Sequence, residues 1–230
     1  MNSIFLTGEK DGKSNFFLFK IFFGLIMMMS LSSNLAFGKI QDNKKNGVDE
    51  EQRVALDSFF NIDELPEISL FFSLDDWNKL LTYYDEDKNN NNFVECSLSI
   101  SNKGSEISID SIGVRIRGGW SRKRPEGETG QYHVADNTNW HHCSFAVNLN
   151  KFTEGKDRKI GGVEKFDLKY FNIDPTYVRE PYCYDLFRRY GITTSIRASY
   201  CKVQIYVKGD SKPAYYGIYM LMEHIDKDYL

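Results

Sequence analysis

Basic residues and glycines gather in one short stretch, GVRIRGGWSRKRP, at residues 113–125. Alternation along a strand places Arg115 and Arg117 on one face, and Arg122 follows across a Gly-Gly pair. Glycine permits a positive φ and close approach of the backbone to a ligand, while arginine offers forked donors that match phosphate or carboxylate oxygens. The stretch predicts either an anion cradle or a solvent-facing basic turn, and the solvated turn is the more common of the two.

A second candidate for chemistry is Glu223, which follows an apolar run at the end of an expected strand. A carboxylate there could orient a lysine or hold Mg²⁺, or it could pair with a neighbouring arginine. His133, His141 and His142 lie close in sequence, but adjacent histidines on a strand point to opposite faces and no carboxylate lies at a standard offset. No metal site is therefore predicted. The sequence also lacks a Walker loop, G-x-G-x-x-G and G-x-S-x-G.

The composition is that of one globular domain. The chain has 230 residues, a formal net charge of -3, 41% hydrophobic residues and 15% aromatic residues. That length is enough to bury a substantial core. The near-zero charge argues against a general nucleic-acid binder, which would carry a clear basic excess. Any basic site must therefore be local.

The first residues resemble an export signal. Lysines precede the apolar run at residues 21–38, and Ala36-Phe37-Gly38 has the small-x-small pattern of a cleavage site. We expect a signal peptide at 1–38 with cleavage after Gly38, a polar linker at 39–53 and the folded domain at 54–230, so that the protein is secreted or on the cell surface. The alternative is a retained membrane anchor, although serines interrupt a run that is short for a span.

Export bears on the cysteines, which are Cys96, Cys143, Cys183 and Cys201. Four cysteines allow three pairings, and the absence of a C-x-x-C motif makes a structural zinc site a poor fit. Burial as free thiols is at least as good an explanation as disulfide formation, because Cys183 lies in an apolar helical pattern and Cys201 opens a strand.

The elements that must position these residues form an α+β pattern, mainly antiparallel sheet with helices. A strand at 65–73 leads into a helix that begins with a Ser73–Asp76 capping box. A hairpin at 93–118 follows, with a bulge at Asp110-Ser111, where the alternation slips. A long loop at 121–140, strands near 143–150 and 164–171, a helix at 174–192 and a second hairpin at 200–225 complete the pattern.

The second helix carries its own boundary signals. Asp174 is expected as its N-cap, Pro175 as its first residue and Gly191 as its stop, while Pro181 should kink or restart it. The chain ends just after Asp226, which could begin another helix with little left to pack against. The pattern therefore predicts an amino-terminal part of something larger.

An ordered set of stretches resembles the CotH family, the spore-coat-protein-H-like atypical kinases. The stretches run from about residue 65 to the last residue and read DDWNKLL, IGVRIRGGWSR, SFAVNLNKF, KFDLKYFNIDPTYVREPYCYDLFRRYGI, KVQIYVKGD and YYGIYMLMEHIDKDYL. The family generally reads R-x-[KR]-G-N-[ST]-S-R in the second stretch and G-x-Y-x-x-x-E in the last. The matching residues are Arg115, Arg117, Gly118, Ser121 and Arg122 in the former, and Gly217, Tyr219 and Glu223 in the latter.

The resemblance implies a two-lobed fold distantly similar to protein kinases, with this chain corresponding to the N-lobe region and truncated before the C-lobe. It implies ATP and Mg²⁺ or Mn²⁺ as cofactors, and phosphorylation of Ser or Thr hydroxyls on secreted, surface or coat proteins. Arg117, Ser121 and Arg122 would contact the ATP phosphates, with Arg115 and Gly118 beside them, and Glu223 would position a basic residue or a metal. Partners would be a nucleotide and a protein substrate, with no nucleic acid, and membrane contact only through an uncleaved signal segment.

The sequence also departs from the family. Cys143 stands where the family commonly has a phosphate-anchoring lysine, and Lys169 on the next expected strand is the candidate substitute. Gly119 replaces an asparagine, and Trp120 stands where a small hydroxyl is usual. The aspartates expected for catalysis lie beyond Leu230, so no catalytic residue is assigned and the fragment is expected to be inactive alone. The alternatives are a noncatalytic surface or coat protein and, on aromatic content alone, a carbohydrate-associated module.

Overall fold

The computed structural model of the protein describes residues 58–154 and 157–225. The expected signal peptide, the linker, the first residues of the domain and Asp226 lie outside this part of the chain.

Seven strands and two helices make up the named elements of the described residues. In chain order they are β1 (Glu67–Phe72), α3 (Leu74–Glu86), β2 (Val94–Asn102), β3 (Ser105–Arg117), β4 (Ser144–Asn148), β5 (Lys165–Lys169), α4 (Arg179–Arg189), β6 (Ala198–Val207) and β7 (Ala214–Glu223). This is an α+β fold with mainly antiparallel pairing, as the sequence predicts.

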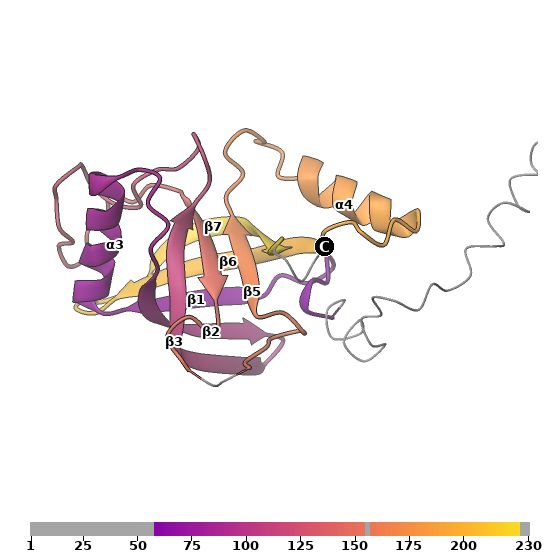
Figure 1. The fold of residues 1–230 in the computed structure, drawn as a ribbon, viewed down its shortest axis with the longest axis horizontal. Coiled ribbons are helices and arrows are strands. Elements are labelled where there is room, and N and C mark those ends of the chain that lie inside the picture. Colours follow the sequence, from indigo (N-terminus) through magenta and orange to yellow (C-terminus); the bar gives the residue numbers. More distant parts are fainter. Residues whose placement is uncertain (1–57, 155–156, 226–230) are drawn as a thin grey trace, which may run out of the picture. The chain divides into compact units, whose positions relative to one another are not determined.

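The strands close into a barrel in the order β1-β2-β3-β4-β5-β7-β6 (Figure 1). Neighbouring strands are antiparallel except β1 and β6, which are parallel and close the barrel. Both expected hairpins form, β2–β3 and β6–β7. The expected bulge also forms, because the β2–β3 register shifts between Cys96 and Leu98, opposite Asp110-Ser111, and Ser111 has a φ of 56°.

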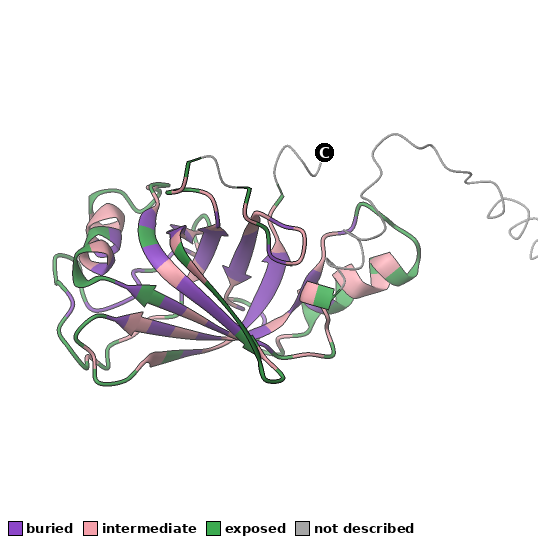
Figure 2. Ribbon diagram, turned by 90° about the horizontal axis from the view of Figure 1, so that it is seen from below, coloured by how far each residue is buried: buried purple, intermediate pink, exposed green. Residues whose placement is uncertain are grey.

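Alternation along the strands separates the core from the outer face of the barrel. On β3, Val114 and Ile116 are buried in the main core, while Arg115 and Arg117 alternate with them and are only partly buried. The same alternation places the side chain of Lys169 on the opposite face of β5 from that of Leu168, which is fully buried. Figure 2 shows that buried residues are concentrated in the strands, whereas exposed residues lie mainly in the loops, at the hairpin ends and on the helices. Side chains that could bind a ligand therefore stand on the outside of β3 and β5.

Helix α3 packs on the barrel through Trp77, Leu80 and Leu81, which are all buried. Its start is the one predicted, because Ser73 Oγ accepts a hydrogen bond from the Asp76 N–H at 3.0 Å. The Ser73 hydroxyl in turn donates to the Asp76 carboxylate at 2.5 Å, which completes the capping box.

Helix α4 begins later than the sequence predicts. Asp174 caps a turn instead, Tyr177 interrupts the helix with a φ of 60°, and α4 starts at Arg179. Pro181 therefore lies in the first turn, where its missing N–H is not needed, and does not kink the helix. Gly191 ends α4 as expected, with a φ of 80° and its N–H donating to the Arg188 carbonyl at 2.9 Å.

Helix α4 lies at one end of the barrel and extends away from it, with its contacts to the sheet made mainly at β6 (Figure 1). A second, smaller core forms there from Phe171, Ala198, Met220 and Met222. Within the described part of the chain, neither helix has the length and apolarity needed to cross a membrane.

Candidate functional site

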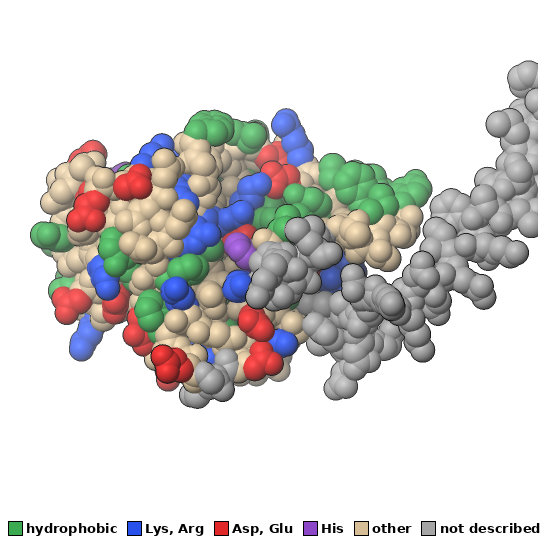
Figure 3. Space-filling view, in the orientation of Figure 1, with side chains coloured by type: hydrophobic (Ala, Val, Ile, Leu, Met, Phe, Trp, Pro, Cys, Tyr) green, Lys and Arg blue, Asp and Glu red, His purple; other side chains and the backbone are tan. Residues whose placement is uncertain are grey.

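A pocket of about 300 Å³ lies where the segments after β3 and β5 meet the start of α4. We call it the Lys169 pocket. Its charged and hydroxyl-bearing lining residues are Arg117, Ser121, Ser144, Lys169, Tyr170, Asp174 and Glu180. Figure 3 shows Lys and Arg side chains gathered on the face that carries β4 and β5, beside hydrophobic side chains over α4. A concave site with a few convergent polar groups is the usual form of a small-molecule site.

The central contact of the pocket is an ion pair between strand and helix. Lys169 Nζ lies 2.7 Å from Glu180 Oε1 and 2.5 Å from Oε2. The two side chains are 35% and 39% exposed, so the pair faces solvent rather than the core. An ammonium has three donors, and this pairing leaves one for a ligand while Glu180 fixes the direction of the lysine. The lysine is therefore oriented and still accessible.

Arg117 is oriented by a buried carboxylate. Its Nη1 lies 3.2 Å from Asp167 Oδ2, and the Asp167 side chain is 2% exposed against 26% for Arg117. His224 contacts the same carboxylate through Nδ1 at 3.1 Å, which gives Asp167 a second partner. Nη1 also contacts the Met222 sulfur at 3.6 Å. The closest contacts of Arg117 with other described residues are made through Nη1, and Nε and Nη2 are further N–H donors of a kind that suits an anion.

The turn after β3 brings backbone and hydroxyl groups to the pocket. Gly118 has a φ of 116°, a conformation that favours glycine, and a Cβ there would lie 3.0 Å from Ser121 Oγ. Gly118 and Ser121 both line the pocket beside Arg117. Three of the residues predicted from the sequence are thus brought together with Lys169.

The structure directs Arg115 and Arg122 to another partner, the loop between α3 and β2. Arg122 is 6% exposed and donates to the carbonyls of Gly118, Lys88 and Asn90 at 2.6, 3.1 and 2.8 Å. Its Nη2 and Arg115 Nη1 both donate to Asn91 Oδ1, at 2.6 and 3.0 Å.

Burial lowers the pKa of Arg122, and burial together with the nearby Arg122 lowers that of Arg115. Neither guanidinium lines the Lys169 pocket. Arg122 stabilises the turn that lines the pocket, because its Nε donates a hydrogen bond to the Gly118 carbonyl.

Glu223 also lies outside the pocket. Its carboxylate contacts Arg197 Nη1 at 3.6 Å and accepts from the Arg197 N–H at 3.3 Å. Both side chains are largely buried, 13% and 12% exposed. Glu223 therefore pairs with a neighbouring arginine, which is the structural alternative that the sequence leaves open for this residue.

Cys143 faces the barrel core and is 1% exposed, and burial raises the pKa of its thiol. It stands immediately before Ser144 of β4, so alternation directs it inward, away from Lys169. All four cysteines are free; Cys183 on α4 is exposed, although its apolar helical pattern suggests burial, and the other three are buried.

Asp174 shapes the rim of the pocket. Its carboxylate accepts from the Thr176 hydroxyl at 2.5 Å, from the Thr176 N–H at 3.1 Å and from the Arg179 N–H at 2.8 Å. The hydrogen bond from the Thr176 hydroxyl, with the backbone donors, lowers the pKa of Asp174. The carboxylate thus holds the turn that leads from the pocket into α4.

The described residues offer no ready metal site. No group of three or more His, Cys, Asp or Glu side chains in 58–154 and 157–225 has the arrangement to hold a metal ion. Asp167 and Glu180 are both engaged with cationic partners. The donors that line the Lys169 pocket suit an anion rather than a metal ion.

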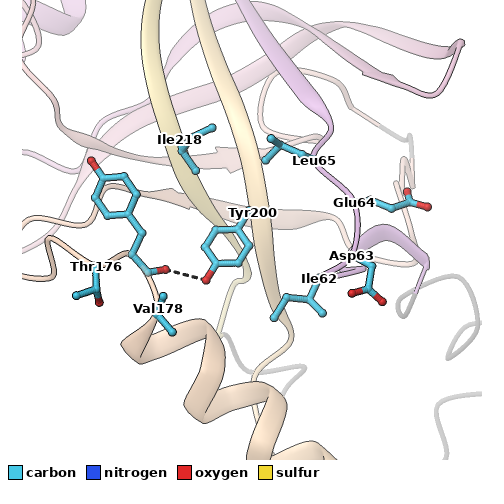
Figure 4. Close-up of a pocket in the computed structure, with 9 residues that line it drawn as sticks. Ile62, Asp63, Glu64, Leu65, Thr176, Val178, Tyr200 and Ile218 are labelled. Atoms are coloured by element: carbon cyan, nitrogen blue, oxygen red, sulfur yellow. Dashed lines mark hydrogen bonds between the residues drawn. The ribbon is translucent and has the colours of Figure 1, made fainter.

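A larger groove of about 440 Å³ differs in chemistry from the Lys169 pocket. Figure 4 shows it between the segment at Ile62 and Leu65 and the turn before α4, with the Tyr200 hydroxyl donating to the Tyr177 carbonyl at 2.7 Å. Its lining is mainly apolar, its charged residues are the acidic Asp63 and Glu64, and it includes no lysine or arginine. It is therefore a poor candidate for binding an anion.

The long loop at 121–140 is expected to be functional, and it contains a buried polar network. Glu126 is 1% exposed and accepts from Trp77 Nε1 at 2.6 Å, while His133 Nδ1 lies 2.9 Å from the same carboxylate. His133 Nε2 lies 3.1 Å from Asp210 in the β6–β7 turn. This network ties the loop to α3 and to the second hairpin, so the polar residues of the loop serve the fold.

Sequence reasoning missed Asp167 and Glu180, the two carboxylates that orient Arg117 and Lys169. A weak signal for Asp167 exists, because KFDLK on an expected strand places Asp167 and Lys169 on the same face. Glu180 carries no such signal until the start of α4 is known. The ion-pair partners of Arg117 and Lys169 depend on which elements become neighbours in the fold. Alternation within one strand does not predict those neighbours.

Comparison with known proteins identifies a family. The family model described as CotH kinase protein matches residues 114–230. The match covers just over half of the chain and includes every residue that lines the Lys169 pocket. No curated protein matches the chain.

Proposed function

Because the chain belongs to the CotH kinase protein family, we propose that it binds a nucleoside triphosphate in the Lys169 pocket as part of kinase-like phosphoryl transfer. The observation that carries this proposal is the accessible Lys169–Glu180 pair beside Arg117. Protein kinases use a strand lysine paired with a helix glutamate in the same way, to hold nucleotide phosphates. Here the lysine ends β5 and the glutamate lies in the first turn of α4, the next helix along the chain.

In the proposed site each group has a distinct role. Lys169 and Arg117 neutralise phosphate oxygens, and the carboxylates of Glu180 and Asp167 keep these cations in place when no ligand is bound. The turn from Gly118 to Ser121 brings a close backbone and a hydroxyl donor to the same oxygens. Because phosphoryl transfer spreads charge over the transferring oxygens, fixed cations of this kind stabilise its transition state.

Bound ATP would supply the phosphoryl group that a protein hydroxyl accepts. We also propose that the acceptor is the hydroxyl group of another protein, and that Mg²⁺ or Mn²⁺ accompanies the bound ATP. No residue described here is assigned as the catalytic base.

Titration calorimetry of the purified chain with ATP tests the binding step. Saturable binding in the presence of Mg²⁺ or Mn²⁺ supports the proposal, and absence of binding at millimolar ATP contradicts it. Incubation with γ-labelled ATP tests transfer separately. Label in the chain or in an added protein supports transferase activity, whereas binding without label favours the alternative of a noncatalytic surface or coat protein that retains a nucleotide site.

We also propose that the protein is exported, with cleavage after Gly38. The support is the sequence of the first residues, where lysines precede an apolar run and a small-x-small pattern. Mass spectrometry of the extracellular protein would give the mature amino terminus. A mature chain beginning at Lys39 supports the proposal, and a cell-retained chain that still carries residues 1–38 contradicts it.

A further inference from the structure

Two large apolar side chains stand exposed at the rim of the Lys169 pocket. Trp120 is 79% exposed and Ile173 is 69% exposed, and both line the pocket. They come from different segments, the turn after β3 and the turn after β5, and β4 runs between those two strands in the sheet. Exposed apolar side chains that flank charged groups in a concave site commonly mark a binding surface.

Both residues are carried on backbone that is held in place. The Trp120 carbonyl accepts from Lys88 Nζ at 3.3 Å, and the Gly119 carbonyl accepts from the Arg122 N–H at 3.1 Å. Ile173 precedes Asp174, whose carboxylate accepts from the Arg179 N–H at 2.8 Å. The two side chains are thus presented to solvent from fixed turns.

The pocket therefore has two chemically different parts. Arg117 and Lys169 suit an anionic group, while Trp120 and Ile173 offer apolar surface, and the indole has a flat face. A volume of about 300 Å³ is at the lower end of the range for small-molecule sites. Stacking of a nucleobase on an aromatic side chain is favourable and tolerant of base identity, because every base has a π face.

We infer that Trp120 and Ile173 hold the nucleobase, so that the pocket selects a nucleotide over inorganic polyphosphate. This inference rests on the proposed function, since it adds a base-binding part to the proposed phosphate site. Trp120 acts here as a specificity-determining residue, because it contacts a part of the ligand that does not react. The weak dependence of stacking on base identity leads us to expect similar affinities for ATP and GTP.

Two probes separate the base from the phosphates: ATP and inorganic tripolyphosphate, each measured by titration calorimetry with Mg²⁺ present. We expect Trp120→Ala to weaken ATP binding roughly 5- to 100-fold and to leave tripolyphosphate binding within about twofold. Ile173→Ser should weaken ATP binding in the same selective way. Tyr190→Ala is the matched control, because Tyr190 is 72% exposed at the end of α4 and does not line the pocket.

Tryptophan fluorescence gives a second readout that does not depend on activity. Trp77 is fully buried and Trp140 is partly buried, so acrylamide quenching reports mainly on Trp120. ATP should protect the fluorescence from acrylamide and tripolyphosphate should not, and Trp120→Phe should abolish the protected signal.

The outcomes separate the two proposals. Equal affinity of the unmodified chain for ATP and tripolyphosphate, or equal loss of both in Trp120→Ala, overturns the base-binding role and leaves the phosphate site intact. Failure of the unmodified chain to bind either probe overturns the proposed function and the inference together. Selective loss of ATP binding in Trp120→Ala, with the control unchanged, supports both.

Discussion

Arg117 shows how a surface cation is fixed by a buried partner. Asp167 is 1% exposed, so its charge needs partners inside the protein, and Arg117 and His224 supply them at 3.2 and 3.1 Å. The same contact that satisfies Asp167 aims the guanidinium at the Lys169 pocket. If the pocket binds an anion as proposed, Arg117 contributes both to stability and to ligand binding.

Arg117→Gln should weaken anion binding and also lower the free energy of unfolding by about 1–3 kcal/mol, because a buried carboxylate loses a charged donor. Denaturant unfolding measures the second effect. Arg115→Gln is the control, since Arg115 stands on the same face of β3 but contacts Asn91 rather than a buried carboxylate. A larger destabilisation by Arg115→Gln than by Arg117→Gln would contradict this account.

Alternation along β3 predicts correctly that Arg115 and Arg117 share one face of the strand. It does not predict that the α3–β2 loop takes up Arg115 and Arg122, because that loop is remote in sequence and its carbonyls become acceptors only in the folded chain. Lys169 is a candidate from its place on the next strand. Its pairing with Glu180, which orients the ammonium group, is not predictable from the sequence, because it depends on where α4 begins.

At the scale of elements, the turn between β5 and α4 determines the residue at which α4 begins. The sequence suggests a helix from Asp174, yet Tyr177 adopts a φ of 60° and the helix starts at Arg179. Local signals identify the stop at Gly191, but they place the N-cap at Asp174 instead of Val178. They do not reveal the extra turn, because the side chain of Tyr177 is placed by stacking on Phe171 at 4.7 Å. Tertiary contacts here override the helical pattern.

Asp174→Asn should destabilise the protein in a pH-dependent way. The hydrogen bond from the Thr176 hydroxyl, with the backbone donors, lowers the pKa of Asp174 below its ordinary value of 3.8. A lowered pKa in the folded state stabilises the fold above the unfolded pKa, and this contribution is lost as the pH falls through the folded pKa. The melting temperature of the variant should lie below that of the unmodified protein at pH 7, with a gap that narrows below about pH 4.

The control for this prediction is Asp157→Asn, because the Asp157 side chain is 72% exposed. Its melting curve should follow that of the unmodified protein at both pH values. A gap for Asp174→Asn that widens as the pH falls would show that its carboxylate does not hold the turn in this manner.

Two glycines with positive φ allow packing to be separated from backbone conformation. A Cβ at Gly161, with a φ of 54°, would lie 2.1 Å from Phe59 Cβ, whereas nothing lies within 4 Å of one at Gly191, with a φ of 80°. Gly191→Ala should cost about 1–2 kcal/mol from its backbone conformation. Gly161→Ala should cost about 1–3 kcal/mol more from overpacking. Equal losses in denaturant unfolding would contradict the close contact with Phe59.

At the scale of the whole molecule, the barrel is closed by two features that sequence patterns do not reveal. One is the parallel pairing of β1 with β6, and the other is the pairing of β5 with β7. Hairpins are predictable because a short turn joins their strands, but pairs that are distant in the chain have no such signal. The strands themselves are nonetheless predicted well, because their alternation reflects a buried inside and a polar outside.

The buried network around Glu126 holds the long loop against the rest of the barrel. Glu126→Gln should lower the free energy of unfolding by about 1–3 kcal/mol, because the amide keeps only one acceptor oxygen and turns its NH2 group toward a buried donor, Trp77 Nε1 or Asn137 Nδ2. Glu128→Gln, on the exposed part of the same loop, is the control and should have little effect. Equal unfolding midpoints for both variants would contradict a structural role for the network.

The most direct test of the central claim is the affinity for ATP of Lys169→Gln, measured by titration calorimetry beside Lys79→Gln. Lys79 is a control that removes the same charge from α3, outside the Lys169 pocket. We predict that Lys169→Gln weakens ATP binding at least tenfold, because one phosphate contact of about 1.5–3 kcal/mol is lost, while Lys79→Gln binds like the unmodified chain. Equal ATP affinity of the two variants would contradict the assignment of the Lys169 pocket as the nucleotide site.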